Sequence, residues 1–122
     1  MNDIPDQLRN DVQQLQALQQ QLQGVIAQRQ QLELQLAEVK GAMDELEKID
    51  ENTPVYKSIG TILVKVRSRE EIKKELADQR EVLDYRTNSL KKQEEVLNGK
   101  ISPLAQRVSQ GLQKYGGGSY PA

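Results

Sequence analysis

Leucine recurs at strict intervals of seven residues through the second half of the chain, and this spacing constrains the fold more than any other feature. The series consists of Leu76, Leu83, Leu90, Leu97 and Leu104. Ile72 precedes it, and Val108 and Leu112 extend it. An apolar residue at every seventh position forms a stripe along an α-helix, and such a stripe is typical of a coiled coil. The pattern therefore predicts a long helix that buries this stripe against a partner helix.

The first half of the chain carries a second apolar seam, in which the spacing alternates between three and four residues. Its members are Leu15, Leu18, Leu22, Val25, Leu32, Leu36, Val39, Met43 and Leu46. Arg29 is the one interruption, and Asp11 falls on the same frame nearer the N-terminus. We therefore expect a helix over residues 4–49. Because the seam loses definition at Asp11, we also expect this end of the helix pair to splay.

Between the two seams lies the one stretch without a helical pattern, residues 53–66. Tyr and β-branched residues dominate it, and apolar residues alternate on either side of Gly60, which predicts a β-hairpin over residues 54–67. A hairpin has two free edges and is marginally stable alone in water, so we expect it to join a sheet made with other subunits. The expected assembly residues are Val55, Tyr56, Ile59, Gly60, Ile62, Leu63, Val64 and Val66.

The second helix is expected over residues 68–115. Ser68 and Glu71 match a capping box, in which each side chain satisfies a free backbone N–H at the helix start. Pro103 has no N–H to donate and its ring crowds the preceding turn, so a bend is expected around residues 99–103. Three successive glycines then end the helix, and residues 116–122 are expected to form a disordered tail.

Folding the chain back at Gly60 brings the two seams into one register. If both helices rise by about 1.5 Å per residue, positions whose numbers sum to about 119 lie side by side. Met43 then meets Leu76, and Leu15 meets Leu104, so two independent patterns agree. The expected fold is mostly α: a long antiparallel two-helix coiled coil with one β-hairpin at its closed end. We expect it to form a single domain spanning residues 1–122.

Composition argues against several classes of function. The chain has no His and no Cys, so the usual general base, thiol nucleophile and soft metal ligands are missing. We expect no enzymatic activity, no metal and no cofactor. The net charge is −1 and lysine pairs have Glu close by without an aromatic platform, so we expect no nucleic-acid partner. No apolar run approaches the roughly 20 residues of a membrane span, so we expect a soluble, cytoplasmic protein without a membrane partner.

Apolar residues continue past the shared seam at the end that no β-structure closes. They are Ile4, Leu8 and Val12 on the first helix and Leu104, Val108, Leu112 and Tyr115 on the second. The end of a two-helix structure cannot bury a broad apolar face completely, and exposed apolar patches usually mark binding sites. From the residues alone, binding of another chain and ordinary packing of the end are equally favoured.

At this point the chain resembles the β class of prefoldin subunits, which are archaeal and eukaryotic co-chaperones. The resemblance covers residues 5–115, and its specific part is Val55-Tyr56-Lys57-x-x-Gly60-x-Ile62-Leu63-Val64-Lys65. It implies a hexamer of two α and four β subunits, whose hairpins build a double β-barrel from which coiled coils hang. It further implies that the coiled-coil tips hold unfolded polypeptides and pass them to a group II chaperonin without nucleotide.

With the resemblance, client binding becomes the favoured role of the seven apolar residues at the open end. The alternative is a structural coiled-coil adaptor that uses the hairpin for assembly and has no affinity for unfolded chains. The ten glutamines between residues 13 and 31 are expected to form a solvated helix surface, with a surface along which client slides as the minority interpretation. Ser102-Pro103 and the glycine-rich end depart from the family pattern.

Overall fold

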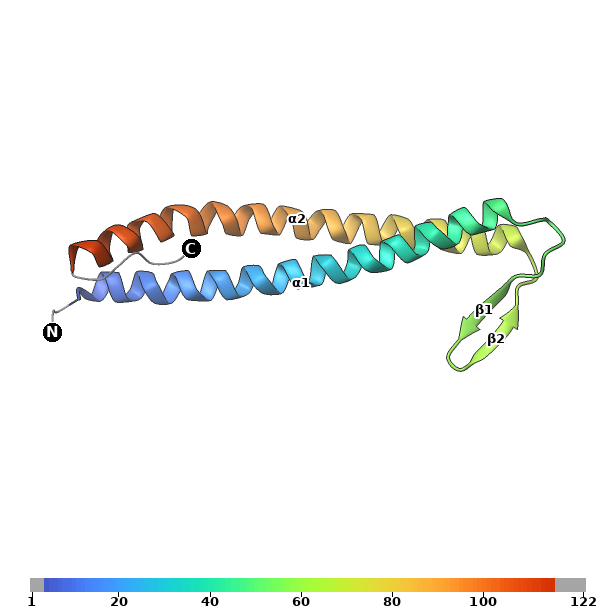
Figure 1. Cartoon of the computed structure of the whole chain (residues 1–122), viewed down its shortest axis with the longest axis horizontal. Coiled ribbons are helices and arrows are strands. Elements are labelled where there is room, and N and C mark those ends of the chain that lie inside the picture. Colours follow the sequence, from blue (N-terminus) through green and yellow to red (C-terminus); the bar gives the residue numbers. More distant parts are fainter. Residues whose placement is uncertain (1–3, 116–122) are drawn as a thin grey trace. The chain divides into compact units, whose positions relative to one another are not determined.

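The computed structural model describes residues 4–115 of the 122-residue chain. Its elements, in chain order, are α1 (Asp6–Lys48), β1 (Tyr56–Ile59), β2 (Ile62–Lys65) and α2 (Arg69–Lys114) (Figure 1). The predicted tail, residues 116–122, lies outside the described residues. No helix within residues 4–115 is both long enough and apolar enough to cross a membrane.

The contacts within the chain divide it into two units. Within the described residues, unit 1 contains 4–29 and 89–115, and unit 2 contains Gln30–Asn88. Each helix contributes one segment to each unit, and the β-hairpin belongs to unit 2. The two units are described separately below.

Local signals in the sequence account for where the helices begin and end. α1 opens with the N–H of Arg9 donating to the carbonyl of Pro5, and Asp6 in the first turn suits the positive end of the helix dipole. After α1, the Asp50 side chain accepts a hydrogen bond from the N–H of Asn52 at 3.1 Å. This local bond favours a turn over continuation of the helix. α2 opens with the N–H of Glu71 donating to Ser68 Oγ at 3.4 Å, as the predicted cap requires.

In unit 1 the two helix segments run antiparallel and share one apolar core. Its buried members are Leu8, Leu15, Val25, Leu90, Leu97, Ile101, Leu104, Ala105 and Val108. Leu8 lies against Gly111, and Asp11 is paired with Arg107. The residue numbers of these two pairs sum to 119 and 118, which agrees with the predicted register.

The predicted splaying of this end is wrong. Leu8 is only 6% exposed and Asp11 only 3%, so the seam continues through Asp11 to the start of α1. A single aspartate does not part the helices because its carboxylate finds a cation on the opposite helix. The seam therefore keeps its apolar contacts on both sides of one charged position.

α2 continues as helix through Pro103 to Lys114. Proline removes the hydrogen bond to the carbonyl of Gly99, four residues back, and crowds that carbonyl. In Figure 1 the orange and red part of α2 curves instead of running straight. The helix is thus curved in this part and has no break at the proline.

In unit 2 the antiparallel helix segments pack through Leu32, Leu36, Leu46 and Leu83, all of which are buried. Polar contacts flank this core near the hairpin. Lys73 Nζ lies 3.3 Å from Glu47 Oε1, and the Arg69 guanidinium donates to the carbonyls of Ile49, at 3.2 Å, and Asp50. Arg69 thus ties the start of α2 to the backbone that follows α1, where the Asp50 carbonyl also accepts a hydrogen bond from the N–H of Thr53.

The hairpin is a two-stranded antiparallel sheet in which Tyr56 pairs with Lys65 and Ile59 pairs with Ile62. Gly60 and Thr61 form its two-residue turn, and Gly60 has a positive φ of 59°. Glycine adopts this conformation without the steric cost that a Cβ imposes, and it is the residue favoured at the first position of a type II′ turn. The predicted fold class, two long helices with one β-hairpin between them in sequence, is confirmed.

Candidate functional site

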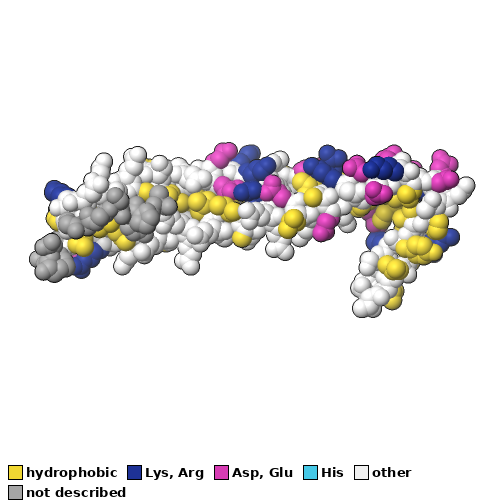
Figure 2. Space-filling view, in the orientation of Figure 1, with side chains coloured by type: hydrophobic (Ala, Val, Ile, Leu, Met, Phe, Trp, Pro, Cys, Tyr) yellow, Lys and Arg dark blue, Asp and Glu magenta, His cyan; other side chains and the backbone are white. Residues whose placement is uncertain are grey.

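The first candidate site is the surface of the hairpin. Five large apolar side chains on β1 and β2 are between 41% and 71% exposed, namely Tyr56, Ile59, Ile62, Leu63 and Val64. Figure 2 shows apolar side chains over this segment. We call these five residues the hairpin surface. Of the other residues that we predicted to take part in assembly, Gly60 lies at the exposed turn, and Val55 and Val66 are half-buried.

The strand register distributes the hairpin surface over both faces of the sheet. Directly paired residues share a face, so Ile59, Ile62 and Val64 lie on one face, whereas Tyr56 and Leu63 lie on the other. Neither face of the sheet is therefore purely polar. A two-stranded sheet in water normally needs one face covered, and this one offers apolar groups on two.

Polar contacts fix where the hairpin joins the rest of unit 2. Lys57 Nζ lies 2.9 Å from Glu75 Oε2 on α2, and the N–H of Val66 donates to the carbonyl of Val55 at 2.8 Å. The second bond extends the pairing of the two chain segments beyond the ladder between β1 and β2. The base of the hairpin is thus held, while its apolar side chains remain uncovered.

The second candidate site is the end of unit 1 formed by residues 4–12 and 104–115, which we call the open helix end. The structure divides its seven predicted binding residues into two groups. Leu8, Leu104 and Val108 are buried between the helices, with Val108 fully buried. The half-exposed group is Ile4, Val12, Leu112 and Tyr115. The end therefore presents a partial apolar surface around a packed interior.

An ion pair between a buried carboxylate and an exposed guanidinium joins the helices at this end. The Arg107 guanidinium donates to Asp11 from Nε to Oδ2 at 3.0 Å and from Nη2 to Oδ1 at 2.9 Å, and Gln7 Nε2 donates to Oδ1 at 3.0 Å. The hydrogen bonds from Arg107 lower the pKa of the Asp11 carboxyl below its ordinary value, although burial acts in the opposite direction. Asp11 is therefore a carboxylate at neutral pH.

This pair was not predicted from the sequence, in which Asp11 is an interruption of the apolar seam and Arg107 lies outside it. A signal was available, because the two residue numbers sum to 118, close to the value at which the two seams align. Opposite charges at matching register positions would have predicted the contact.

A second ion pair in unit 1 explains the other break in the seam. Arg29 donates from Nε to Glu94 Oε2 at 2.5 Å and from Nη2 to Glu94 Oε1 at 3.1 Å. The side chains are 22% and 16% exposed, respectively. Two parallel hydrogen bonds give the contact a defined geometry as well as energy. Arg29 thus interrupts the apolar seam with a specific polar contact to the other helix.

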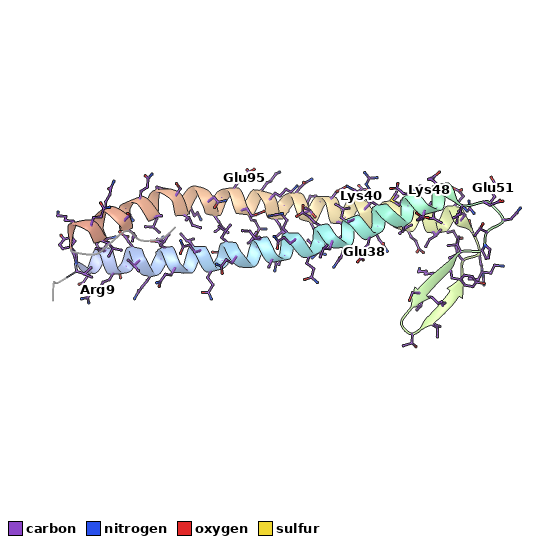
Figure 3. All side chains as sticks on the ribbon, in the orientation of Figure 1. Arg9, Glu38, Lys40, Lys48, Glu51 and Glu95 are labelled. Carbon is purple, nitrogen blue, oxygen red and sulfur yellow. The ribbon has the colours of Figure 1, made fainter. Side chains whose placement is uncertain are left out.

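The rest of the described surface offers little for chemistry. Residues 4–115 contain no group of three or more acidic side chains placed to hold a metal ion. Unit 2 has an open hollow of about 560 Å³ lined by Gln35, Glu38, Val39, Asp78, Gln79, Val82 and Leu83. Figure 3 shows Arg9 and Glu95, in unit 1, on the outer sides of their helices. These features are typical of solvated helix faces.

Comparison with known proteins gives matches over most of the chain. The family model described as "Prefoldin subunit" matches residues 9–115. The prefoldin subunit beta of Archaeoglobus fulgidus is 44% identical over 88% of this chain and 92% of its own length. That of Thermococcus onnurineus is 40% identical over 96% of this chain and 100% of its own length.

A solved structure agrees with both the sequence matches and the fold. The crystal structure of the prefoldin beta subunit from Thermococcus strain KS-1 is 38% identical in sequence and superposes with a TM-score of 0.80. The match covers 90% of this chain and 96% of that one. The resemblance identified from the central segment is thus confirmed, and the chain belongs to the prefoldin subunit family.

Proposed function

We propose that this chain is a β-type subunit of a prefoldin hexamer with two α and four β subunits, acting as one functional domain in the cytoplasm. The hexamer works as an ATP-independent holdase that captures unfolded polypeptides and transfers them to a group II chaperonin. The observation that carries the proposal is the presence of two separate apolar surfaces. The hairpin surface lies on unit 2 and serves assembly, while the open helix end lies on unit 1 and serves client binding.

The hairpin surface supports assembly because its five side chains are between 41% and 71% exposed in the protomer and lie on both faces of the sheet. Strands from other subunits would pair with the free edges, and a closed barrel would remove those edges altogether. The relatives named prefoldin subunit beta match this chain through the whole hairpin, which supports the same use of the segment here.

The open helix end supports client binding because four apolar side chains there are only half covered. Each apolar side chain that a client covers contributes up to roughly 1.5 to 3 kcal/mol before ordering costs, so one end binds weakly. Several ends that act on one unfolded chain gain affinity through effective concentration, provided the chain spans them. Assembly and client binding are in this way parts of one mechanism.

The test uses the chain mixed with an α-type prefoldin subunit. Mass in solution reports assembly, and light scattering of an aggregating client reports protection. We expect the complex to suppress aggregation without nucleotide, and a variant that lacks residues 1–12 and 105–122 to assemble but not protect. If the parent complex assembles and gives no protection, the chain is a structural coiled-coil subunit. If the truncated complex protects equally, the binding surface lies elsewhere on the chain.

A further inference from the structure

Two neighbouring contacts hold the open helix end shut. The first is the ion pair of Asp11 with Arg107, supported by Gln7. The second is the packing of Leu8 on Gly111, where a Cβ atom would lie 2.7 Å from Leu8 Cδ1. The helices approach so closely there because residue 111 has no side chain. We call these five residues the clasp.

The partners in the ion pair differ greatly in exposure. The Asp11 side chain is 5% exposed, whereas the Arg107 side chain is 62% exposed. If the helix ends separate, the Asp11 carboxylate becomes hydrated. The Arg107 guanidinium is already largely hydrated in the closed state, so its hydration changes little. The desolvation of one carboxylate is relieved by the same motion that breaks its hydrogen bonds. The pair is therefore suited to reversible opening, unlike a pair whose two partners are both buried.

The clasp adjoins the two large side chains that are fully buried within residues 4–115. Leu15 and Val108 are both 0% exposed, and Leu104 is 6% exposed. While the clasp is closed, a client reaches only the half-exposed residues at the end. Separation of the two helix ends would add the faces of Leu8, Leu104 and Val108 to the available apolar surface. Three of the seven predicted binding residues are thus accessible only in an open state.

We propose that the clasp gates client capture: the helix ends must separate at Asp11 and Arg107 before an unfolded polypeptide takes the place of one helix against the buried residues. This inference rests on the proposed holdase function and adds a closed state to it. The ligand is an extended segment with apolar side chains, because these replace the contacts that the helices make with each other. The closed state protects the same residues from nonspecific association.

A reversible covalent lock tests the gate directly. The chain has no Cys, so the pair Leu8→Cys and Gly111→Cys introduces the only thiols of the chain at a point where the helices touch. The variant is assembled with an α-type subunit that has no free thiols, then assayed oxidised and again after reduction. We expect the oxidised form to protect client less than the reduced form of the same variant, and the comparison is made within this variant because both forms lack the Leu8 side chain. The single-cysteine variants, treated with the same oxidant, control for oxidation itself.

A substitution that weakens the clasp gives the opposite test. Asp11→Asn removes the charge that Arg107 binds, so amide exchange at the open helix end should rise roughly tenfold and client capture should become faster. Asp44→Asn is the matched control, since Asp44 is an exposed aspartate on the same helix. Faster exchange confined to Asp11→Asn supports the clasp as a gate of local opening.

The outcomes distinguish a failure of the gate proposal from a failure of the holdase function on which it rests. If the oxidised and reduced forms of the double-cysteine variant protect client equally, and the parent protects fully, the proposed gate is wrong and the holdase function stands. Unchanged amide exchange in Asp11→Asn also contradicts the gate. A parent complex that gives no protection contradicts the holdase function, and the gate is rejected with it.

Discussion

The guanidinium of Arg29 on α1 donates two hydrogen bonds to the carboxylate of Glu94 on α2, within a seam that is otherwise mainly apolar. The two residue numbers sum to 123, so the contact reaches about one helical turn beyond the position directly opposite Arg29. Two directional hydrogen bonds join one specific pair of residues, whereas a leucine packs equally well against many apolar neighbours. The pair therefore opposes sliding of one helix along the other.

The first prediction concerns this pair. Glu94→Ala should lower the free energy of unfolding by about 1.5 to 3 kcal/mol, because charged hydrogen bonds are lost and Arg29 stays partly buried. Replacing both residues with leucine should restore at least the parent's stability, since two apolar residues then pack where two charged groups were partly desolvated. Urea unfolding at one fixed protein concentration measures both. If the double variant is as unstable as Glu94→Ala, loss of the ion pair does not explain the lower stability of Glu94→Ala.

The second prediction concerns Thr87, which is 4% exposed and whose Oγ1 has no hydrogen-bond partner in the part of the chain that the structure describes. Thr87→Val keeps the branched shape and removes the unsatisfied hydroxyl. Stability should rise by about 1 kcal/mol. Thr61→Val, at the exposed hairpin turn, is the control and should change little. A loss of stability in Thr87→Val would mean that the hydroxyl is satisfied in solution.

The helices and their register could be predicted because the spacing of apolar residues encodes which face is buried. The seam residues Leu15 and Leu104 illustrate this, since both are buried in unit 1. Gly60 was equally informative, because a two-residue hairpin turn needs a residue that tolerates a positive φ. Periodicity and turn chemistry are local properties, so a single sequence displays them.

The ion pairs were harder to predict, for two different physical reasons. Asp11 and Arg107 lie at matching register positions. Applying the register of the apolar seams to the charged residues would therefore have predicted this pair. Arg29 and Glu94 do not match, because a long side chain reaches along the partner helix to a carboxylate one turn away. Which residue such an arginine selects depends on rotamers, and these are absent from a periodic pattern.

The third prediction is a pH dependence. Hydrogen bonds from Arg107 on α2 and Gln7 on α1 hold the pKa of Asp11 below its unfolded value. Folding is therefore favoured by this residue above the unfolded pKa of about 3.9, and the contribution disappears as pH falls through the lower folded pKa. Unfolding free energies measured from about pH 6 downward should fall less steeply with decreasing pH in Asp11→Asn than in the parent. Parallel curves for variant and parent would contradict the assignment.

The fourth prediction tests the hairpin surface. Val64 is 41% exposed in the protomer, so Val64→Asp should leave the helices folded. In the proposed assembly the same position is covered by other subunits, where an unpaired carboxylate costs several kcal/mol. The variant should therefore fall apart into smaller species, as measured by mass in solution. Thr61→Asp at the turn is the control, and a Val64→Asp complex with the parent's mass would exclude this strand from the interface.

The last prediction concerns the proline in α2. Pro103→Ala restores an N–H that can donate to the carbonyl of Gly99 and removes the ring that crowds it, so helix stability should rise by up to about 3 kcal/mol. The gain should be smaller than this limit because α2 already accommodates the proline without a break. Thermal unfolding and helical content by circular dichroism measure it. Ser102→Ala, an exposed neighbour, is the control for helix propensity alone. If the two variants gain equally, the proline imposes no strain on α2, and the curvature of its last turns follows from packing against α1 in unit 1.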